Sequence, residues 1–180
     1  MRTRVGYAGG AHPDPTYHDL GDHTEAFALD FDPRVITYDD LLAQFWAAHD
    51  PARPAYRRQY MAAIFPSAQQ HAAAIASRDR IAATLGDRTV ETAILPDARF
   101  YFAEDYHQKY HLRHDATLMA ELAHYAPRAF VDSTVAARLN GFAAGHGSIA
   151  QLEAELDLMQ LSPAAVKSIR ARFGRRATAS

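Results

Sequence analysis

The chain has 180 residues, a formal net charge of −2 and a hydrophobic content of 48%. This length suits one domain with a small appendage, and so small a charge offers no overall field for nucleic acid or an anionic membrane. The sequence shows no apolar run that would span a bilayer and no secretory signal, so we expect a cytoplasmic protein without nucleic-acid or membrane partners. The absence of cysteine from these residues excludes disulfides, thiolate metal ligands and a cysteine nucleophile among them.

The first expected element is a strand that ends at two glycines. Residues alternate in character along Arg2–Tyr7, which is typical of a strand, and Gly9 and Gly10 follow closely. Paired glycines allow the backbone to turn sharply and to approach another group closely. We therefore expect this strand to bring the hydroxyl of Tyr7 to the edge of a site.

A second expected strand contains a carboxyl group. Phe27, Leu29 and Phe31 share one parity, and Glu25 has the same parity. We expect this face to turn toward the core, which would place the Glu25 carboxyl at an apolar rim. Such surroundings favour the protonated carboxyl, which can donate to a developing oxyanion. From the pattern alone, the alternative is a glutamate at a strand end that bends into solvent.

Caps and breakers predict the elements that follow. The sequence predicts a helix from Tyr38 to about Ala48 behind a Thr37–Asp40 capping box, a strand buried on both faces over Tyr60–Phe65, a helix capped by Ser67 and Gln70 and stopped by Gly86, a short strand over Thr89–Leu95, and a helix from Glu104 to about Tyr125 that is broken near Asp115.

The last third of the chain is expected to be helical and joined by glycines. The sequence predicts a helix over Ser133–Asn140, a linker over Gly141–Gly147, a helix capped by Ser148 and Gln151, and a second helix that starts at Ser162–Pro163 and ends at Gly174. We therefore divide the chain into an α+β domain at 1–125, an Ala/Gly-rich connection at 126–147 and a helical hairpin at 148–180.

Several short motifs occur in an order that resembles one enzyme family. The motifs VGYAGG, PTY, HTEA, FDP, ITYDDLL, HDP, ETAILP and FYFAEDYHQKY stand between residues 2 and 110. This order resembles the methionine sulfoxide reductase A family. The resemblance implies an α+β, ferredoxin-like two-layer sandwich, here followed by a helical extension. It implies reduction of methionine-S-sulfoxide, free or in proteins, with thioredoxin as reductant, and we expect no cofactor and no metal.

The resemblance also implies roles for three residues. By position, Glu25 would protonate the sulfoxide oxygen, and the hydroxyls of Tyr7 and Tyr60 would bind it. Without the resemblance, the two tyrosines read as half-buried core residues with satisfied hydroxyls. The family's nucleophilic cysteine belongs to a Gly-Cys-Phe-Trp-Gly motif that should lie upstream of Tyr7. The loops before His23 and Gln59 are also shorter than the family pattern, and an expected Asn-Asp motif is missing before Gln59.

Two interpretations remain open. In the first, the chain is a methionine-S-sulfoxide reductase whose start is placed too late, at an internal start codon or after a selenocysteine codon read as a stop. In the second, it is a catalytically inactive relative that binds methionine, its sulfoxide or a protein partner. The ferredoxin-like pattern with its first strand and helix missing predicts either a gap beside the Val5 strand or a C-terminal segment packed into that gap.

Two further patterns are given structural readings. His107, His111 and His114 have a spacing that would place them on one helix face, as in some metal sites. His107 lies inside the AEDYHQKY motif, which favours a structural role. The basic residues of the last helix read as a solvated helix end and not as a nucleic-acid site; they are Lys167, Arg170, Arg172, Arg175 and Arg176.

Overall fold

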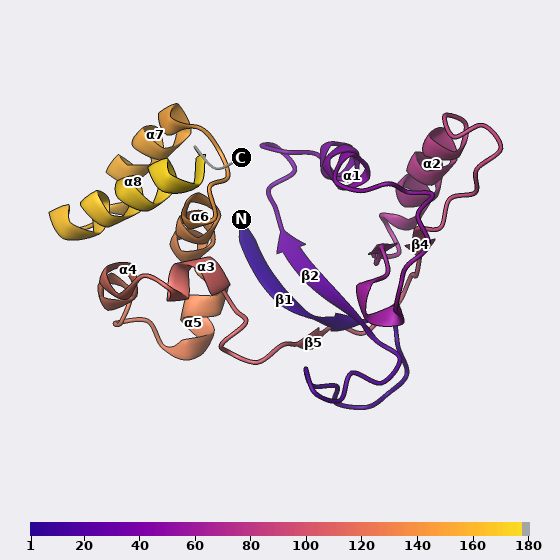
Figure 1. The fold of residues 1–180 in the computed structure, drawn as a ribbon, viewed down its shortest axis with the longest axis horizontal. Helices are drawn as coiled ribbons and strands as arrows, with labels where there is room; N and C mark the ends of the chain where they lie inside the picture. Colours follow the sequence, from indigo (N-terminus) through magenta and orange to yellow (C-terminus); the bar gives the residue numbers. More distant parts are fainter. Residues whose placement is uncertain (178–180) are drawn as a thin grey trace. The chain divides into compact units, whose positions relative to one another are not determined.

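The structure is a computed structural model that describes residues 1–177, and it divides into two compact units. The sheet unit comprises Val5–Ala103, and the helical unit comprises Met1–Arg4 with the chain from Glu104 onward (Figure 1). The elements in chain order are β1 (Arg2–Ala8), β2 (Thr24–Asp30), α1 (Tyr38–Ala47), a 3₁₀ turn η1 (Arg58–Tyr60), β3 (Ala63–Ile64), α2 (His71–Ala82), β4 (Ala93–Ile94), β5 (Tyr101–Phe102), α3 (Tyr110–Arg113), α4 (Ala116–Glu121), α5 (Pro127–Asp132), α6 (Thr134–Ala143), α7 (Ile149–Met159) and α8 (Pro163–Ala177). This combination of strands and helices agrees with the expected α+β class.

The strand that begins the chain is the middle strand of its sheet. The order is β2-β1-β5, with Gly6 opposite Phe102 in the antiparallel β1–β5 pair, and Figure 1 shows β1 and β2 running in opposite directions. The expected gap beside the Val5 strand is therefore wrong, because this strand has a neighbour on each side. No C-terminal strand joins it either, since the described residues after 126 form only helices and their connections.

The other two strands of the sheet unit form a separate sheet. Strands β3 and β4 are parallel, and within the described chain they pair only with each other. The strand expected over Tyr60–Phe65 shrinks to Ala63–Ile64, because Tyr60 closes the turn η1. An apolar run alone does not distinguish a strand from a turn followed by a short strand.

The two helices of the sheet unit enclose a small core. Leu42, Trp46, Ile64 and Ala74 are buried together in it. The indole Nε1–H of Trp46 donates to the Ser77 hydroxyl at 3.0 Å, and that hydroxyl donates to the Ala74 carbonyl at 2.7 Å. This relay satisfies the polar groups that bring α1 and α2 together.

The predicted cap is correct for α1 and wrong for α2. The Thr37–Asp40 capping box is present at the start of α1, as expected. Helix α2 begins only at His71, whereas the prediction placed its cap at Ser67. The Gln70 side chain accepts from the Ser67 N–H at 3.1 Å, so these residues form a turn before the helix and not its first turn.

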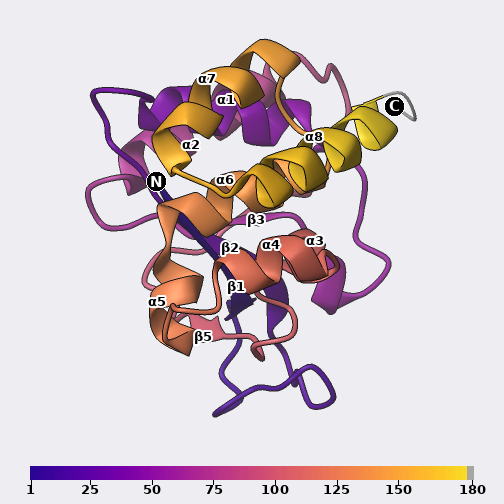
Figure 2. The same cartoon turned by 90° about the vertical axis from the view of Figure 1, so that its left-hand side faces the viewer.

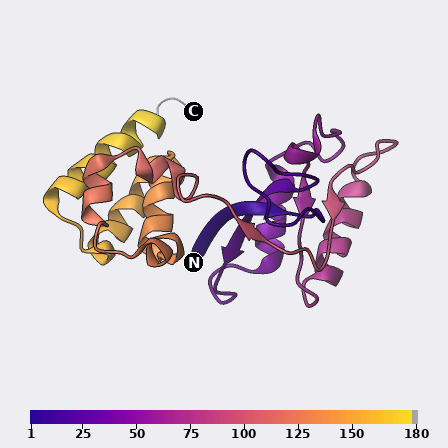
Figure 3. The same cartoon turned by 90° about the horizontal axis from the view of Figure 1, so that it is seen from below.

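The helical unit has its own core. Helix α6 packs against α3 and α5, and α8 packs against α4 and α6 (Figures 2 and 3). The buried residues are Leu112, Leu118, Leu122, Phe130, Val131, Ala136, Leu139, Phe142, Ala143, Leu152, Leu156, Ala165, Ile169 and Phe173. Because α3 and α4 belong to this core, the boundary between the compact units along the chain falls between Ala103 and Glu104. The division predicted from the sequence was at residue 125.

Several predicted ends of helices in this unit need correction. Asp115 caps α4 and breaks the helix as expected, but residues 104–109 are not helical because Lys109 adopts a left-handed conformation with φ of 54°. Helix α6 continues through Gly141 to Ala143, so the linker is shorter than predicted. Helix α8 also passes through Gly174, where the sequence predicted its end. Glycine lowers helix stability by only about 1 kcal/mol, which packing against α4 and α6 overcomes.

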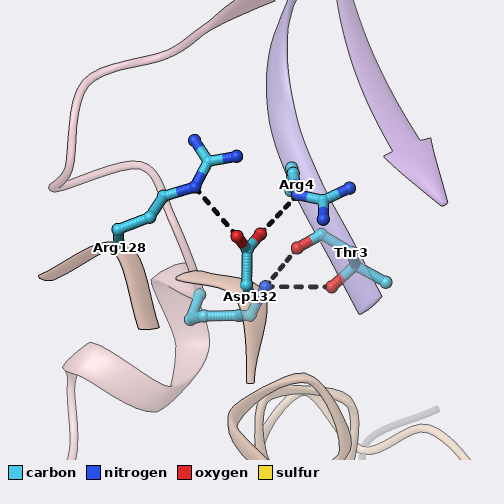
Figure 4. Close-up of polar contacts among 5 residues, drawn as sticks. Thr3, Arg4, Arg128 and Asp132 are labelled. Carbon is cyan, nitrogen blue, oxygen red and sulfur yellow. Dashed lines mark hydrogen bonds and ion pairs between the residues drawn. The ribbon is translucent and has the colours of Figure 1, made fainter. Parts of the chain in front are cut away.

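The first residues of the chain are attached to the helical unit by charged groups (Figure 4). Asp132 accepts from Arg4 Nε at 2.5 Å and from Arg128 Nε at 2.8 Å. The ammonium group of Lys109 donates to the Thr3 carbonyl oxygen and, at 3.1 Å, to the Thr3 hydroxyl. Burial lowers the pKa of Lys109 to about 8, and the Arg4 guanidinium acts in the same direction. The Asp132 carboxylate therefore pairs with two guanidinium groups and also lies close enough to Lys109 to raise its pKa.

The capping box at the start of α7 provides a stability test. The Ser148 hydroxyl accepts from the Gln151 N–H at 3.2 Å, and the Gln151 side chain accepts from the Ser148 N–H at 2.8 Å. We expect Ser148→Ala to lower the free energy of unfolding by about 1 kcal/mol in denaturant titrations. Ser148→Asp keeps an acceptor at this position and should retain most of the stability. Equal losses in both variants would contradict the capping role.

Candidate functional site

The turn after β1 folds tightly onto the residues before β2. Gly9 has a positive φ of 83°, and a Cβ atom on Gly10 would lie only 2.4 Å from Asp22 Oδ1 and 2.7 Å from the His23 nitrogen. Residues with a side chain rarely adopt such a positive φ, and a Cβ atom would not fit so close to another residue. The two glycines therefore make the turn and the close approach that the sequence predicts. The end of β1 is thereby held against the start of β2.

Two side chains before β2 satisfy the backbone of this turn. The buried His23 ring accepts from the Gly10 N–H through Nδ1 at 3.2 Å, and its Nε2–H donates to the His12 carbonyl at 2.8 Å. The Asp22 carboxylate accepts from the N–H groups of Ala11 and His12, each at 2.9 Å. The hydrogen bond from the His12 N–H has the largest effect on the pKa of Asp22, and together with that from Ala11 it holds this pKa below its ordinary value. The turn is thus fixed by the two side chains that stand just before β2.

The turn η1 is attached to the start of β2. The Thr24 hydroxyl donates to the Gln59 carbonyl at 2.8 Å, and the Gln59 side-chain amide donates to Glu25 Oε1 at 2.8 Å. Both bonds join Gln59 of η1 to neighbouring residues at the start of β2. They bring the peptide segment of Tyr60 beside Glu25.

Arg58 is a residue of the site that the sequence analysis missed. Its guanidinium donates through Nη2 to the Gly9 carbonyl at 2.8 Å and through Nε to the Asp22 carbonyl at 3.1 Å. One side chain therefore joins η1, the end of β1 and the residues before β2. No local sequence pattern predicts this role, because Gly9 and Asp22 lie 49 and 36 residues away from Arg58 in the sequence.

The three predicted site residues differ in their surroundings. Glu25 is exposed, Tyr60 is 58% exposed, and Tyr7 is buried at 2% exposure on the adjacent strand β1. The expectation that the Glu25 face turns into the core is wrong. Phe27 shares this face and is 67% exposed, because none of the described residues covers it. An acidic and an aromatic side chain are thus exposed on one face of β2, and the acidic one bonds Gln59, the residue before Tyr60.

The other patterns do not form a site. His107 precedes α3, which begins at Tyr110, so the three histidines do not share one helix face. Within residues 1–177, no group of three or more potential ligands is arranged to hold a metal ion. Helices of the length and apolarity required to cross a bilayer are also absent from this described part. In α8, Arg170 pairs with Glu153, and Arg172 donates to the Ala143 carbonyl; the side chain of Arg176 lies outside the described residues.

Comparisons with known proteins connect both units to one family. The profile described as "Peptide methionine sulfoxide reductase" matches residues 1–138, and that described as "Selenoprotein methionine sulfoxide reductase A, helical domain" matches residues 129–171. The second match covers the region for which the motifs suggested no relative.

Individual relatives agree with these profiles. A peptide methionine sulfoxide reductase of Drosophila melanogaster is 39% identical over 165 residues, which cover 91% of this chain and 67% of that protein. Peptide methionine sulfoxide reductase A5 of Oryza sativa is 38% identical over 150 residues, covering 80% and 59%. The structure is similar to that of methionine sulfoxide reductase A of Corynebacterium diphtheriae, with a TM-score of 0.53 and 31% identity over 69% of this chain and 66% of that one.

The matched region spans about three fifths to two thirds of the length of these relatives. The profile match nevertheless extends over more than half of the present chain, and it includes the glycine turn, Glu25 and η1. These matches agree with the α+β fold and with the motifs between residues 2 and 110. The chain belongs to the peptide methionine sulfoxide reductase family.

Proposed function

We propose that this chain binds methionine-S-sulfoxide, free or in proteins, and supplies the groups that act on its oxygen during reduction to methionine. The contact between Gln59 and Glu25, at 2.8 Å, is the observation on which this proposal depends. It orients an otherwise exposed carboxyl group next to the segment of Tyr60. Among the described residues, the second carboxyl oxygen of Glu25 has no hydrogen-bond partner, so it is available to a ligand.

The proposed roles follow from the chemistry of the sulfoxide. Its oxygen accepts hydrogen bonds and gains negative charge as the sulfur is attacked. Tyr60 and Tyr7 would donate to this oxygen, and Glu25 in its protonated form would transfer a proton to it. Arg58 and Thr24 would act as positioning residues, because they hold η1 to the two strands without contacting the ligand.

The reduction also requires a nucleophile and two electrons. A sulfoxide and two thiols give a sulfide, a disulfide and water, through attack of a thiolate on the sulfur and release of the protonated oxygen. The 180 residues contain no cysteine, so the thiol, or the selenol that replaces it, must come from outside them. The match to the helical domain of selenoprotein reductases supports a selenol as one source. We propose thioredoxin as the final reductant.

The absence of cysteine also favours a second candidate function. A chain that retains the oxygen-binding groups but has no nucleophile of its own would bind methionine sulfoxide without reducing it. Both candidates require the same binding site. They differ in whether a thiol or selenol joins that site.

Binding and turnover therefore need separate measurements. For the purified 180-residue chain, we expect the (S)-sulfoxide of N-acetylmethionine amide to perturb the amide NMR resonances of Glu25 and Tyr60 in a saturable manner. The (R) epimer should bind at least about tenfold more weakly, because its oxygen points away from the donors. With dithiothreitol or thioredoxin as reductant, this chain should produce no methionine above background.

Matched variants test the assigned groups. Glu25→Gln keeps an oxygen that can accept from Gln59 but removes the ionisable carboxyl group. Tyr60→Phe removes the hydroxyl donor. Each should weaken binding of the (S) epimer by about tenfold without changing the unfolding midpoint. Equal affinity for both epimers, or binding unaffected by both variants, would contradict the proposed site. Turnover by the cysteine-free chain would contradict the proposed chemistry.

A further inference from the structure

We infer that residues 51–57, named the basic loop here, dock an acidic segment of the protein or peptide that contains the oxidised methionine. This inference rests on the function proposed above and specifies its substrate class. The loop contains Arg53, Tyr56 and Arg57, and all three side chains are exposed.

The arginines of the loop differ from most other arginines of the sheet unit. Four of these pair with aspartates at 2.7 to 3.5 Å: Arg34 with Asp32, Arg78 with Asp79, Arg80 with Asp39, and Arg88 with Asp50. Among the described residues, neither Arg53 nor Arg57 has a carboxylate within ion-pair distance. Asp50, at the base of the loop, is already engaged, because it pairs with Arg88 and accepts from the Ala52 N–H at 3.1 Å. The positive charge of the loop is therefore not offset within the unit.

Aromatic side chains accompany this charge. Tyr56 is 87% exposed, and the Arg57 guanidinium lies 5.5 Å from the centre of its ring. Tyr60 and Phe27 are also largely exposed in the neighbouring site. Exposed tyrosine and arginine together are enriched at surfaces that bind other proteins, because they combine apolar area with hydrogen-bond donors.

The loop is held next to the candidate site by its last residue. The Tyr60 N–H donates to the Arg57 carbonyl at 3.0 Å, and Arg58 is attached to the carbonyls of Gly9 and Asp22. An extended peptide advances about 3.3 Å per residue. A carboxylate two to four residues from the oxidised methionine would thus lie about 7 to 13 Å from the sulfoxide. We therefore expect it to meet the loop that joins η1 at Arg57.

Exposed arginine and tyrosine could also serve a nucleic acid, but the surroundings favour a peptide. The chain has a net charge of −2, and the Glu25 carboxyl stands in the site beside the loop. Every nucleotide of a nucleic acid carries a negative phosphate, so a strand bound along the loop would also be repelled by this carboxylate. In a peptide, the negative charges can be confined to the residues that contact the loop. An acidic peptide with methionine sulfoxide therefore fits both the loop and the site.

Fluorescence anisotropy with labelled peptides tests the inference. Three peptides are needed: an (S)-sulfoxide flanked by glutamates, the same sulfoxide flanked by lysines, and unoxidised methionine flanked by glutamates. We expect the acidic sulfoxide peptide to bind the 180-residue chain about tenfold more tightly than the lysine peptide at low salt, and the difference to shrink as salt is added. The double variant Arg53→Glu, Arg57→Glu should abolish or reverse this preference.

Controls separate this inference from the proposed function. The variant Arg34→Glu, Arg80→Glu makes the same change in net charge elsewhere on the unit and should keep the preference for acidic flanks. If both flanking charges bind equally while the sulfoxide remains preferred over methionine, the docking inference is overturned and the proposed function stands. If oxidised and unoxidised acidic peptides bind equally, the proposed function fails, and the inference fails with it. A single-stranded oligonucleotide that binds more tightly than the acidic peptide, through the same arginines, would overturn the inference in favour of nucleic acid.

Discussion

Replacing Asp132 with asparagine should destabilise the helical unit by about 3 kcal/mol at neutral pH, because Arg4 and Arg128 would each lose an ion pair with a partly buried carboxylate. Arg4 and Arg128 both donate to Asp132 (Figure 4). Lys109 belongs to the same cluster, because Arg4 and Asp132 both act on its pKa. The Arg4 side chain is 12% exposed and that of Asp132 is 26% exposed, so water offers only partial compensation. Chemical denaturation followed by near-ultraviolet circular dichroism would measure the loss.

The pH dependence of this loss has a defined sign. Hydrogen bonding from Arg4 lowers the pKa of Asp132 below 3.8. A carboxyl group with a lowered pKa stabilises the folded state above its unfolded pKa, and this contribution disappears as the pH falls through the folded value. The difference in unfolding free energy between wild type and Asp132→Asn should therefore be complete at pH 7 and shrink below pH 3.8.

Lys109 should change stability in the same direction, but in a higher pH range. Its pKa is about 8 in the folded state, below the ordinary value of 10.5, so stability rises as the pH increases between these values. Because the Asp132 carboxylate raises this pKa, Asp132→Asn should extend the rise to lower pH. Glu153→Gln, at an exposed ion pair with Arg170, is the matched control and should change stability little. A similar loss in both variants would show that the cluster has no special role.

Local signals in the sequence predicted local structure well. The caps at Thr37 and Ser148 were correct, and so was the helix break near Asp115. At each of these positions a side chain bonds a backbone group two or three residues away. The sharp turn at Gly9 and Gly10 was also predicted. The region after 125 was recognised as helical, although its profile match was not foreseen from motifs.

Features that depend on distant partners were not predictable. The exposure of the Glu25 face depends on which elements cover it, whereas strand parity indicates only which residues share a face. The role of Arg58 depends on carbonyl groups of Gly9 and Asp22 that lie far away in sequence. The run over Tyr60–Phe65 has strand composition, but bonds from Thr24 and to Glu25 hold its start in a turn. Long-range polar contacts therefore decide the geometry of the candidate site.

The second large effect is expected for Gly10→Ala, which should disrupt the candidate site and lower the unfolding free energy of the sheet unit by about 3 kcal/mol. The added Cβ would lie 2.4 Å from Asp22 Oδ1 and 2.7 Å from backbone atoms of Asp22 and His23. Backbone atoms cannot yield as the end of a flexible side chain can. The turn must therefore move away from β2, which breaks the contact between the Gly10 N–H and His23.

This displacement should reach the ligand site through Arg58. Its guanidinium bonds the carbonyls of Gly9 and Asp22, so a shift between them removes at least one bond that positions η1. We expect binding of the methionine-(S)-sulfoxide to fall by at least about tenfold, measured in the NMR titration together with the unfolding midpoint. Gly141→Ala is the matched control, because that glycine lies inside α6 with no neighbouring atom within 4 Å of its added Cβ. This control should preserve binding and stabilise the helix by up to about 1 kcal/mol; full stability and binding in Gly10→Ala would refute the tight apposition of the turn and β2.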